Sequence, residues 1–448
     1  MDHDEKPYGE NCFRGADDHG AAAVFVAGFC ENSTVYYGFR YTGSEPLTVV
    51  LTGENSITLN GTEGEKAALE GFSSDADLVF AGGGSLTVTA GAAEYSMAVR
   101  SKGTISFNGG SICAASGEGQ ASSFAVSADH GINISSGSLT CESGKAKEYS
   151  LSLYSNGAVT VSGGSVTVAA ANAQYSQAVW CDKGFELKDG VVNMTAGEGA
   201  GCSYGIYIHT GDAVISGGTL NTDGSVSGEW SCGIWCSGGL SLKDGTLNAA
   251  SGKAKNASMG IYTQTKEITI DGGNLYTQAG EAEFSAGVYS GEGIIINGGE
   301  ITAKAGDALT GKGGSVGIQG CKFLTINDGT VTALAGKACH ESYGMNSVVI
   351  NGGNITSMGG EIVGTSPEPE AWDYGGFGVD STMTLNGGTV HISGHTRAVL
   401  NSVTTSLRGA GYTDAAGTEG QTAISAGDQE QKLEFLNVQF PVNMSFGK

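Results

Sequence analysis

Apolar and polar residues alternate along most of this chain, and the alternation is broken at regular intervals by a short turn that ends in glycine. The pattern is plainest in residues 296–303, Ile-Asn-Gly-Gly-Glu-Ile-Thr-Ala. Alternation with a period of two is typical of β-strands that bury one face. The second turn glycine recurs at steps of 24 to 35 residues, mostly near 27, as Gly84, Gly110, Gly137, Gly164, Gly190, Gly218, Gly245, Gly273, Gly299, Gly329, Gly353 and Gly388.

Each repeat predicts three strands. Inward positions lie five and three residues before the glycine, as in Ile268 and Ile270, and two and four residues after it, as in Ile301 and Ala303. A third strand follows a loop and is centred on a small residue with an aliphatic residue after it, as in residues 233–234. A repeat of this length without helical spacing predicts an all-β fold, a right-handed parallel β-helix, with neighbouring coils about 4.8 Å apart.

The repeats predict one elongated domain with a distinct cap at each end. About 12 to 13 coils of ~27 residues occupy residues 47–394, and stacking them buries a continuous core that no single coil could form. Residues 1–46 lack the repeat and are interpreted as an amino-terminal cap, and residues 395–448 as a last partial coil with a carboxy-terminal cap. Caps are expected because an open coil exposes an unpaired sheet edge.

The third strand carries the residues that bear on function. Two positions after the small residue, six consecutive coils place an aromatic residue: Tyr154, Trp180, Tyr207, Trp235, Tyr262 and Tyr289. Because the preceding aliphatic residue faces inward, these rings are predicted on the outer face, in a stripe of roughly 24 Å. The next outward column is polar and includes Asn156, Asp182, His209 and Gln264.

An aromatic stripe beside polar side chains favours carbohydrate binding, because rings contact the apolar face of a sugar while amides and carboxylates bind its hydroxyls. The alternative is that the rings only fasten neighbouring rungs of the sheet. Ten serines in register, from Ser96 to Ser342, precede the small residue by two positions. They predict a structural corner that satisfies backbone groups, since no histidine accompanies them as a base would.

Composition narrows the partners. Lys+Arg 22 against Asp+Glu 46 gives a formal charge of -24, which disfavours nucleic acid and anionic membrane surfaces, and no stretch reaches transmembrane length. The first residues show no signal-peptide pattern, so such a peptide was removed or never existed. Cys181 and Cys236 are predicted to be buried free thiols, whereas pairing of Cys12 with Cys30 stays open.

Residues 47–57, 67–71 and 82–91 resemble the opening coils of secreted bacterial β-helix proteins called carbohydrate-binding domain-containing proteins, and the similarity extends over roughly residues 47–394. The resemblance implies a non-catalytic, polysaccharide-binding or adhesin-like protein, extracellular or at the cell surface. Some relatives carry calcium in aspartate-rich turns. Here Asp189, Asp244 and Asp328 are isolated, so no metal or other cofactor is predicted and calcium stays a weak alternative.

The outward columns of the predicted solenoid also bear on enzymatic and other functions. Pectin lyases and polygalacturonases share this architecture, but Asp129 and Asp182 lie two coils apart without a converging third group, so the chain is predicted not to be an enzyme. A polysaccharide lyase or glycoside hydrolase, and a passive surface stalk, remain alternatives. Ice binding is disfavoured because Tyr276 interrupts the ladder of small hydroxyls. The oligomeric state cannot be inferred from these residues.

Overall fold

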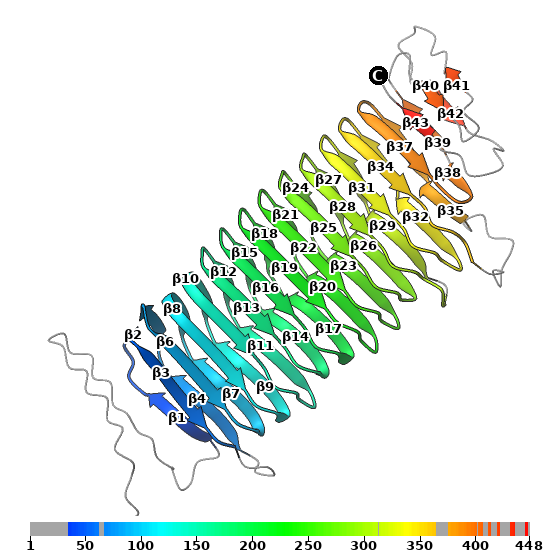
Figure 1. The fold of residues 1–448 in the computed structure, drawn as a ribbon. Coiled ribbons are helices and arrows are strands. Elements are labelled where there is room, and N and C mark those ends of the chain that lie inside the picture. Colours follow the sequence, from blue (N-terminus) through cyan, green and yellow to red (C-terminus); the bar gives the residue numbers. More distant parts are fainter. Residues whose placement is uncertain are drawn as a thin grey trace, which may run out of the picture.

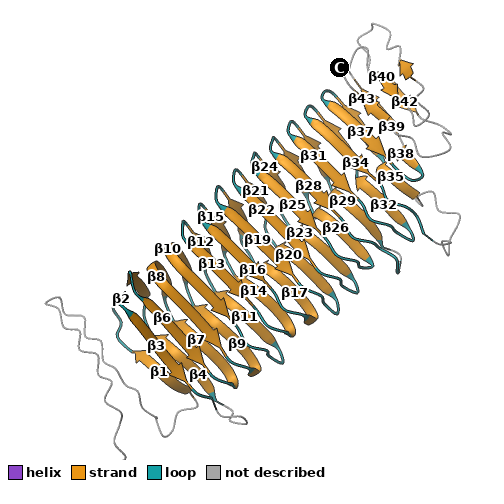
Figure 2. Ribbon diagram, in the orientation of Figure 1, coloured by secondary structure: helices purple, strands orange, loops and turns teal. Residues whose placement is uncertain are grey.

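The computed structural model describes residues 35–61, 67–311, 313–363 and 375–400, together with the short strands at 402–405, 411–413, 419–421, 431–434 and 444–446. The described chain is a stack of coils with parallel strands that run across the long axis (Figure 1). The described residues contain no helix, and therefore none that could span a membrane (Figure 2). The predicted all-β parallel solenoid is confirmed, with a coil count close to the predicted one.

One side of the solenoid is a sheet of 14 parallel strands, one from each successive coil. This sheet contains the strands predicted around the small residue and will be called the first sheet. In order, its strands are β1 (Val35–Tyr41), β4 (Ala68–Ser74), β7 (Ala93–Ser101), β9 (Gly119–Ala128), β11 (Tyr149–Ser155), β14 (Ala173–Cys181), β17 (Gly199–Ile208), β20 (Trp230–Cys236), β23 (Ala257–Thr263), β26 (Phe284–Ser290), β29 (Gly314–Gly320), β32 (Glu341–Met345), β35 (Gly375–Val379) and β38 (Arg397–Val399).

Two further parallel ladders flank the glycine turn. The ladder before the turn contains β2 (Leu47–Leu51), β5 (Leu78–Gly82), β8 (Thr104–Ser116), β10 (Gly131–Glu142), β12 (Ala158–Val161), β15 (Gly184–Leu187), β18 (Asp212–Ile215), β21 (Leu240–Leu242), β24 (Ile268–Ile270), β27 (Gly293–Ile296), β30 (Phe323–Ile326), β33 (Val348–Ile350), β36 (Thr382–Leu385) and β39 (Ser402–Thr405). The ladder after the turn contains β3 (Glu54–Leu59), β6 (Ser85–Ala90), β13 (Ser165–Ala169), β16 (Val191–Thr195), β19 (Thr219–Gly224), β22 (Thr246–Ser251), β25 (Asn274–Gln278), β28 (Glu300–Lys304), β31 (Thr330–Leu334), β34 (Asn354–Met358) and β37 (Thr389–Ser393). Strands β8 and β10 continue through the turn and join both ladders.

The ends differ from the middle of the solenoid. At the amino-terminal end, β1 lies within the predicted cap of residues 1–46 but pairs with β4 in the first sheet, and residues 1–34 lie outside the described part. At the other end, β42 (Gln431–Glu434) and β43 (Met444–Phe446) pair antiparallel with β39 and β37. A separate antiparallel pair is formed by β40 (Gly411–Thr413) and β41 (Glu419–Gln421). The antiparallel strands occupy the edge that the last coil would otherwise expose.

Nearly all of the recurring turn glycines adopt a left-handed backbone conformation. Eleven of the twelve second glycines have positive φ, and Gly84 in the first repeat is the exception. A side chain there would also collide with the neighbouring coil, since a Cβ on Gly245 would lie 2.6 Å from the Gly218 carbonyl oxygen. Glycine is therefore required both by the left-handed backbone and by the close approach of successive coils.

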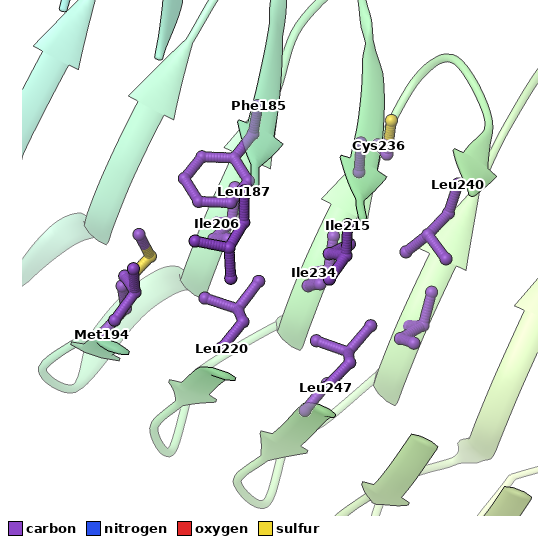
Figure 3. Packing of buried hydrophobic residues seen from close by; sticks show 14 of the residues in the cluster. Phe185, Leu187, Met194, Ile206, Ile215, Leu220, Ile234, Cys236, Leu240 and Leu247 are labelled. Carbon is purple, nitrogen blue, oxygen red and sulfur yellow. The ribbon is translucent and has the colours of Figure 1, made fainter. Parts of the chain in front are cut away.

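The interior is a continuous apolar column. Side chains from all three strand ladders contribute to it, as Leu187, Ile206 and Leu220 do in Figure 3. The residues predicted to point inward are buried, including Ile105, Phe107 and Ile268. Because each coil covers the apolar side chains of the next, burial is shared along the whole stack.

The ten serines of the predicted corner connect successive coils through the backbone. Each is fully buried, donates its hydroxyl to a loop carbonyl of its own coil, and accepts an N–H from the loop of the next coil. Ser203 donates to the Gly197 carbonyl over 2.8 Å and accepts from the Ser225 N–H over 2.8 Å. The predicted structural role of the serine column is confirmed.

Replacing one of these serines should weaken the stack. In Ser203→Ala, a buried N–H and a buried carbonyl each lose a partner, which we expect to cost about 1–3 kcal/mol. The midpoint of urea unfolding, followed by circular dichroism, should fall accordingly. Ser136→Ala is the matched control, because Ser136 lies exposed beside a glycine turn. An unchanged midpoint in Ser203→Ala would contradict the role assigned to the column.

The described cysteines are free thiols. Cys181 and Cys236 are fully buried, as predicted, and burial raises the pKa of both, that of Cys236 to about 12. Cys321 is exposed. Cys12 and Cys30 lie outside the described residues, so their pairing is untested.

Thiol labelling should separate these classes. At neutral pH an uncharged aromatic disulfide reagent should modify Cys321 in the folded protein within minutes, because the thiolate is the nucleophile and this thiol is exposed. Cys181 and Cys236 should react only after denaturant is added. Peptide mapping by mass spectrometry identifies the labelled sites, and rapid labelling of Cys236 in the folded chain would show that its coil opens.

Candidate functional site

The small residue of each strand in the first sheet interrupts the regular alternation. Between β17 and β20 the register pairs Tyr204 with Cys232 and Ile206 with Ile234, but it skips the glycine pair between them. A Cβ on Gly205 would point inward and meet the Thr222 hydroxyl at 2.0 Å, while Ile206 also belongs to the core. Two successive residues therefore face the interior, and the residue before them returns to the outer face.

This bend creates a second apolar layer outside the core. The residue before each small one forms an outward column that is buried in most coils: Tyr204, Cys232, Met259, Ala286, Val316, Tyr343 and Phe377. Four of the predicted aromatics pack against this layer and are half-buried: Tyr207, Trp235, Tyr262 and Tyr289. Strict alternation would have placed the residue before each small one inside the solenoid. The sequence therefore did not predict this outer apolar layer.

The six aromatics form one continuous column. The strand register pairs each with the next, from Tyr154 on β11 to Tyr289 on β26. Successive ring centroids are separated by 4.7, 6.5, 4.5, 5.7 and 5.7 Å. We call this column the aromatic stripe.

The rings of the aromatic stripe face one another along the solenoid. Interplanar angles are 14° to 27° except at Trp235–Tyr262, where the rings are tilted by 40°. Two rings whose centroids are only 4.5 or 4.7 Å apart cannot lie side by side in one plane. These pairs are therefore offset stacks. The stripe consequently presents mainly ring edges and polar tips to solvent rather than open ring planes.

The step between Trp180 and Tyr207 is the widest in the aromatic stripe. His209 lies beside it, with its ring 5.9 Å from Trp180 and 6.4 Å from Tyr207. On the same rungs, the buried Gln177 has a side-chain carbonyl oxygen with no hydrogen-bond donor among the described residues. The widest step is therefore flanked by an imidazole ring, whereas the unpaired Gln177 oxygen on these rungs is buried beneath the outer face.

The predicted polar column lies next to the aromatic stripe. The Tyr154 hydroxyl donates to Asn156 over 2.6 Å, and the Asp182 carboxylate is 2.9 Å from His209 Nδ1. Gln264 is exposed in the same column. The structure thus brings all ten predicted site residues onto one face, and Asp182 and His209 are held in a defined geometry by their contact.

Sequence reasoning did not anticipate a hollow of about 280 Å³ at the corner beyond the polar column. It lies where the coil containing Gly239 is shorter, so Lys266 reaches across that coil to Asp212, with Nζ 2.8 Å from Oδ2. Gly239 N–H also donates to Asp212 over 2.9 Å. Burial would raise the pKa of Asp212, but the hydrogen bonds from Lys266 and Gly239 hold it below its ordinary value. The sequence signal is one extra residue in each neighbouring coil, between β17 and β18 and between β23 and β24, relative to the corner that contains Gly239.

No group of three or more His, Cys, Asp or Glu side chains in the described ranges could hold a metal ion. The turn residues Asp189, Asp244 and Asp328 each bind the N–H of the following glycine through their own carboxylate. These carboxylates serve the turn, and their residues do not provide a calcium cage.

Comparison with protein families identifies the wider relationship. The family model described as "Carbohydrate-binding domain-containing protein" matches residues 43–308, which is more than half of the chain and includes the whole aromatic stripe. The chain belongs to this family. No curated protein and no solved structure matches it. The resemblance inferred from the turn and strand motifs is therefore confirmed by an independent comparison.

The Asp212–Lys266 pair predicts a measurable pKa change. Because Asp212 has a lowered pKa when folded, its ionisation contributes stability above its unfolded pKa, and that contribution is lost as pH falls through the folded pKa. Lys266→Met should shift the Asp212 titration in carboxyl-carbon NMR towards the ordinary aspartate range. Lys253→Met, which removes the exposed pair with Glu281, should leave Asp212 unchanged. An unshifted Asp212 in Lys266→Met would mean that the pair is absent in solution.

Proposed function

We propose that this protein is a non-catalytic polysaccharide-binding protein, adhesin-like and located outside the cell or at its surface. The observation that carries the proposal is the aromatic stripe, six rings in register on one outer face of a chain in the carbohydrate-binding family. A single smooth stripe suits a linear polymer, since equivalent contacts recur with the coil spacing of about 4.8 Å. The alternative of a purely structural ladder predicts no binding.

The ring orientation favours a particular mode of contact. A polysaccharide lying along the stripe would meet ring edges, the Tyr hydroxyls and the Trp N–H groups, rather than a row of flat platforms. Aromatic residues with a polar tip suit such a half-apolar surface. The step between Trp180 and Tyr207 is the best position for a sugar ring, because it is the widest of the stripe and His209 lies beside both rings.

The neighbouring polar groups would supply hydrogen bonds to hydroxyls. Asp182 and His209 are already oriented by each other, so fixing them on a ligand costs little additional side-chain entropy. The hollow beside Lys266 continues the polar surface around the corner and could receive a branch of the polymer. The net charge of -24 disfavours a ligand that carries a carboxylate on every sugar.

A non-catalytic role is supported by the family and by the arrangement of carboxylates. Asp182 is engaged with His209, and Asp129 lies two coils before it on the same side. Glycoside hydrolysis needs two carboxyl groups flanking one bond, one of them free to act as an acid. No second carboxylate contacts Asp182 among the described residues.

The decisive experiment is affinity electrophoresis in native gels that contain soluble polysaccharides of different backbones. The wild-type protein should be retarded by at least one of them. Trp180→Ala should weaken that retardation about tenfold in apparent Kd, as truncation of a central aromatic contact commonly does. Tyr276→Ala is the matched control, since Tyr276 is 39% exposed but lies on β25 in a different ladder.

Thermal unfolding of Trp180→Ala should be recorded in parallel, because the ring also stacks on Tyr154 and Tyr207. Equal retardation of wild-type protein and Trp180→Ala would overturn the role of the stripe. Retardation by no polymer would favour the passive stalk, and release of reducing ends or unsaturated sugars would contradict the non-catalytic assignment.

A further inference from the structure

The outer face that carries the aromatic stripe changes character towards the amino-terminal end. On β1, β4 and β7, and on the turns after β4 and β7, charged side chains replace the rings. We call this group the charged cluster. Its members are Arg40, Glu70, Asp75, Arg100 and Lys102.

The charged cluster is held together by direct contacts. Arg100 Nη1 is 3.1 Å from the Glu70 carboxylate, and the Ser73 hydroxyl donates to the other Glu70 oxygen over 2.5 Å. Lys102 Nζ is 2.7 Å from Asp75, whereas Arg40 Nη2 approaches Asp75 only to 3.5 Å. These contacts fix the guanidinium and ammonium groups in place before any ligand arrives.

The cluster has an excess of positive charge. Three cations face two carboxylates, in a chain whose acidic residues outnumber its basic ones 46 to 22. The pKa of Asp75 lies below its ordinary value, mainly because of the hydrogen bond from Lys102, so Asp75 stays ionised and is shared by Lys102 and Arg40. Two cations that share one carboxylate favour an anion on the side of Arg40, Asp75 and Lys102 that faces away from Asp129, which lies one coil beyond Lys102.

The arginines also have unused donors. Arg40 Nε and Arg100 Nε are buried and have no hydrogen-bond acceptor among the described residues. Each guanidinium has five N–H donors, and each of these two contacts only one carboxylate. Arg40 is positioned over the Tyr37 ring at 4.4 Å, which orients its plane. The two arginine side chains are 36% and 31% exposed, so a ligand would reach the outer N–H groups of each guanidinium and not the buried Nε. A carboxylate or sulfate group is the natural acceptor for these outer donors.

The charged cluster is continuous with the aromatic stripe. Arg100, Ser127 and Tyr154 occupy equivalent positions on three successive strands, so Arg100 lies about 9.6 Å from the first ring along the axis. A polymer that follows the stripe would extend over the cluster without changing direction. The cluster and the stripe can therefore contact one chain at the same time.

We propose that the charged cluster is an anion-binding subsite for an acidic substituent, a uronic-acid carboxylate or a sulfate ester, on the polysaccharide that lies along the aromatic stripe. The proposal rests on the proposed function and specifies its ligand as a sparsely charged glycan. Asp129 and Asp182 follow on the polar column, and they would repel a polymer with an anion on every sugar. The recognised glycan is thus mostly neutral, with occasional anionic groups.

The test uses glucuronoxylan and the same polymer after reduction of its carboxyl groups to alcohols. Isothermal titration with the full chain should give a Kd for the native polymer about three- to tenfold lower than for the reduced one. The difference should shrink as NaCl is raised from 20 to 500 mM, because screening weakens the ion contacts. A third sample, the reduced polymer after sparse chemical sulfation, distinguishes a carboxylate from a sulfate as the preferred group.

Lys102→Gln is the informative variant, because Lys102 is largely exposed and its loss leaves no buried charge unpaired. It should abolish most of the preference for the acidic polymer, and Lys102→Arg should retain it. Lys253→Gln, a change of equal charge at an exposed lysine paired with Glu281, should not alter the preference. Arg100→Gln is a second test, with thermal unfolding recorded because Glu70 would lose its partner.

The outcomes separate this subsite from the function of the stripe. If both polymers bind equally well and Trp180→Ala weakens both, the stripe binds glycans and the anion subsite is wrong. If neither neutral nor sparsely acidic polymers bind, the proposed function itself fails. A preference for the acidic polymer that is lost equally in Lys102→Gln and Lys253→Gln reflects overall charge and overturns the subsite.

Discussion

Everything on this protein's surface depends on the vertical register between coils. Each strand pairs in parallel with its equivalent one coil away, and the column of serines ties consecutive loops together through the backbone. Serine suits the position because a single hydroxyl both donates and accepts, so it satisfies one group in its own coil and one in the next. A slip of one residue in any coil would break these hydrogen bonds and turn the apolar positions outward.

The register converts a linear repeat into a surface with defined columns. Residues 27 or so positions apart in the chain become neighbours at the spacing of a β-ladder, which is why six rings can stack without any local sequence signal joining them. The same constraint lines up the charged cluster with the aromatic stripe. Binding a long polymer needs such repetition, because each contact is weak and many must be made in line.

The small residue in the first sheet gives this surface its depth. By letting two successive residues turn inward, it returns the preceding residue to the outside and places a buried apolar layer under the aromatics. The rings are supported from below by Tyr204, Cys232 and Met259 and from the sides by one another. They are therefore held rigidly, which reduces the entropy lost on binding but turns their planes away from solvent.

The sequence by itself determined the architecture, because alternation, turn glycines and the serine column are local patterns that recur with one period. It also placed the aromatic stripe on the outer face, since the buried aliphatic next to each ring fixes the side. It could not determine the ring orientation, the inner apolar layer or the hollow beside Lys266. These depend on a bend at the small residue, on a coil shortened at Gly239, and on contacts between side chains that lie one or two coils apart. Such distances are set only when the coils stack, because the packing of neighbouring side chains, and not the spacing along the chain, decides which faces remain open.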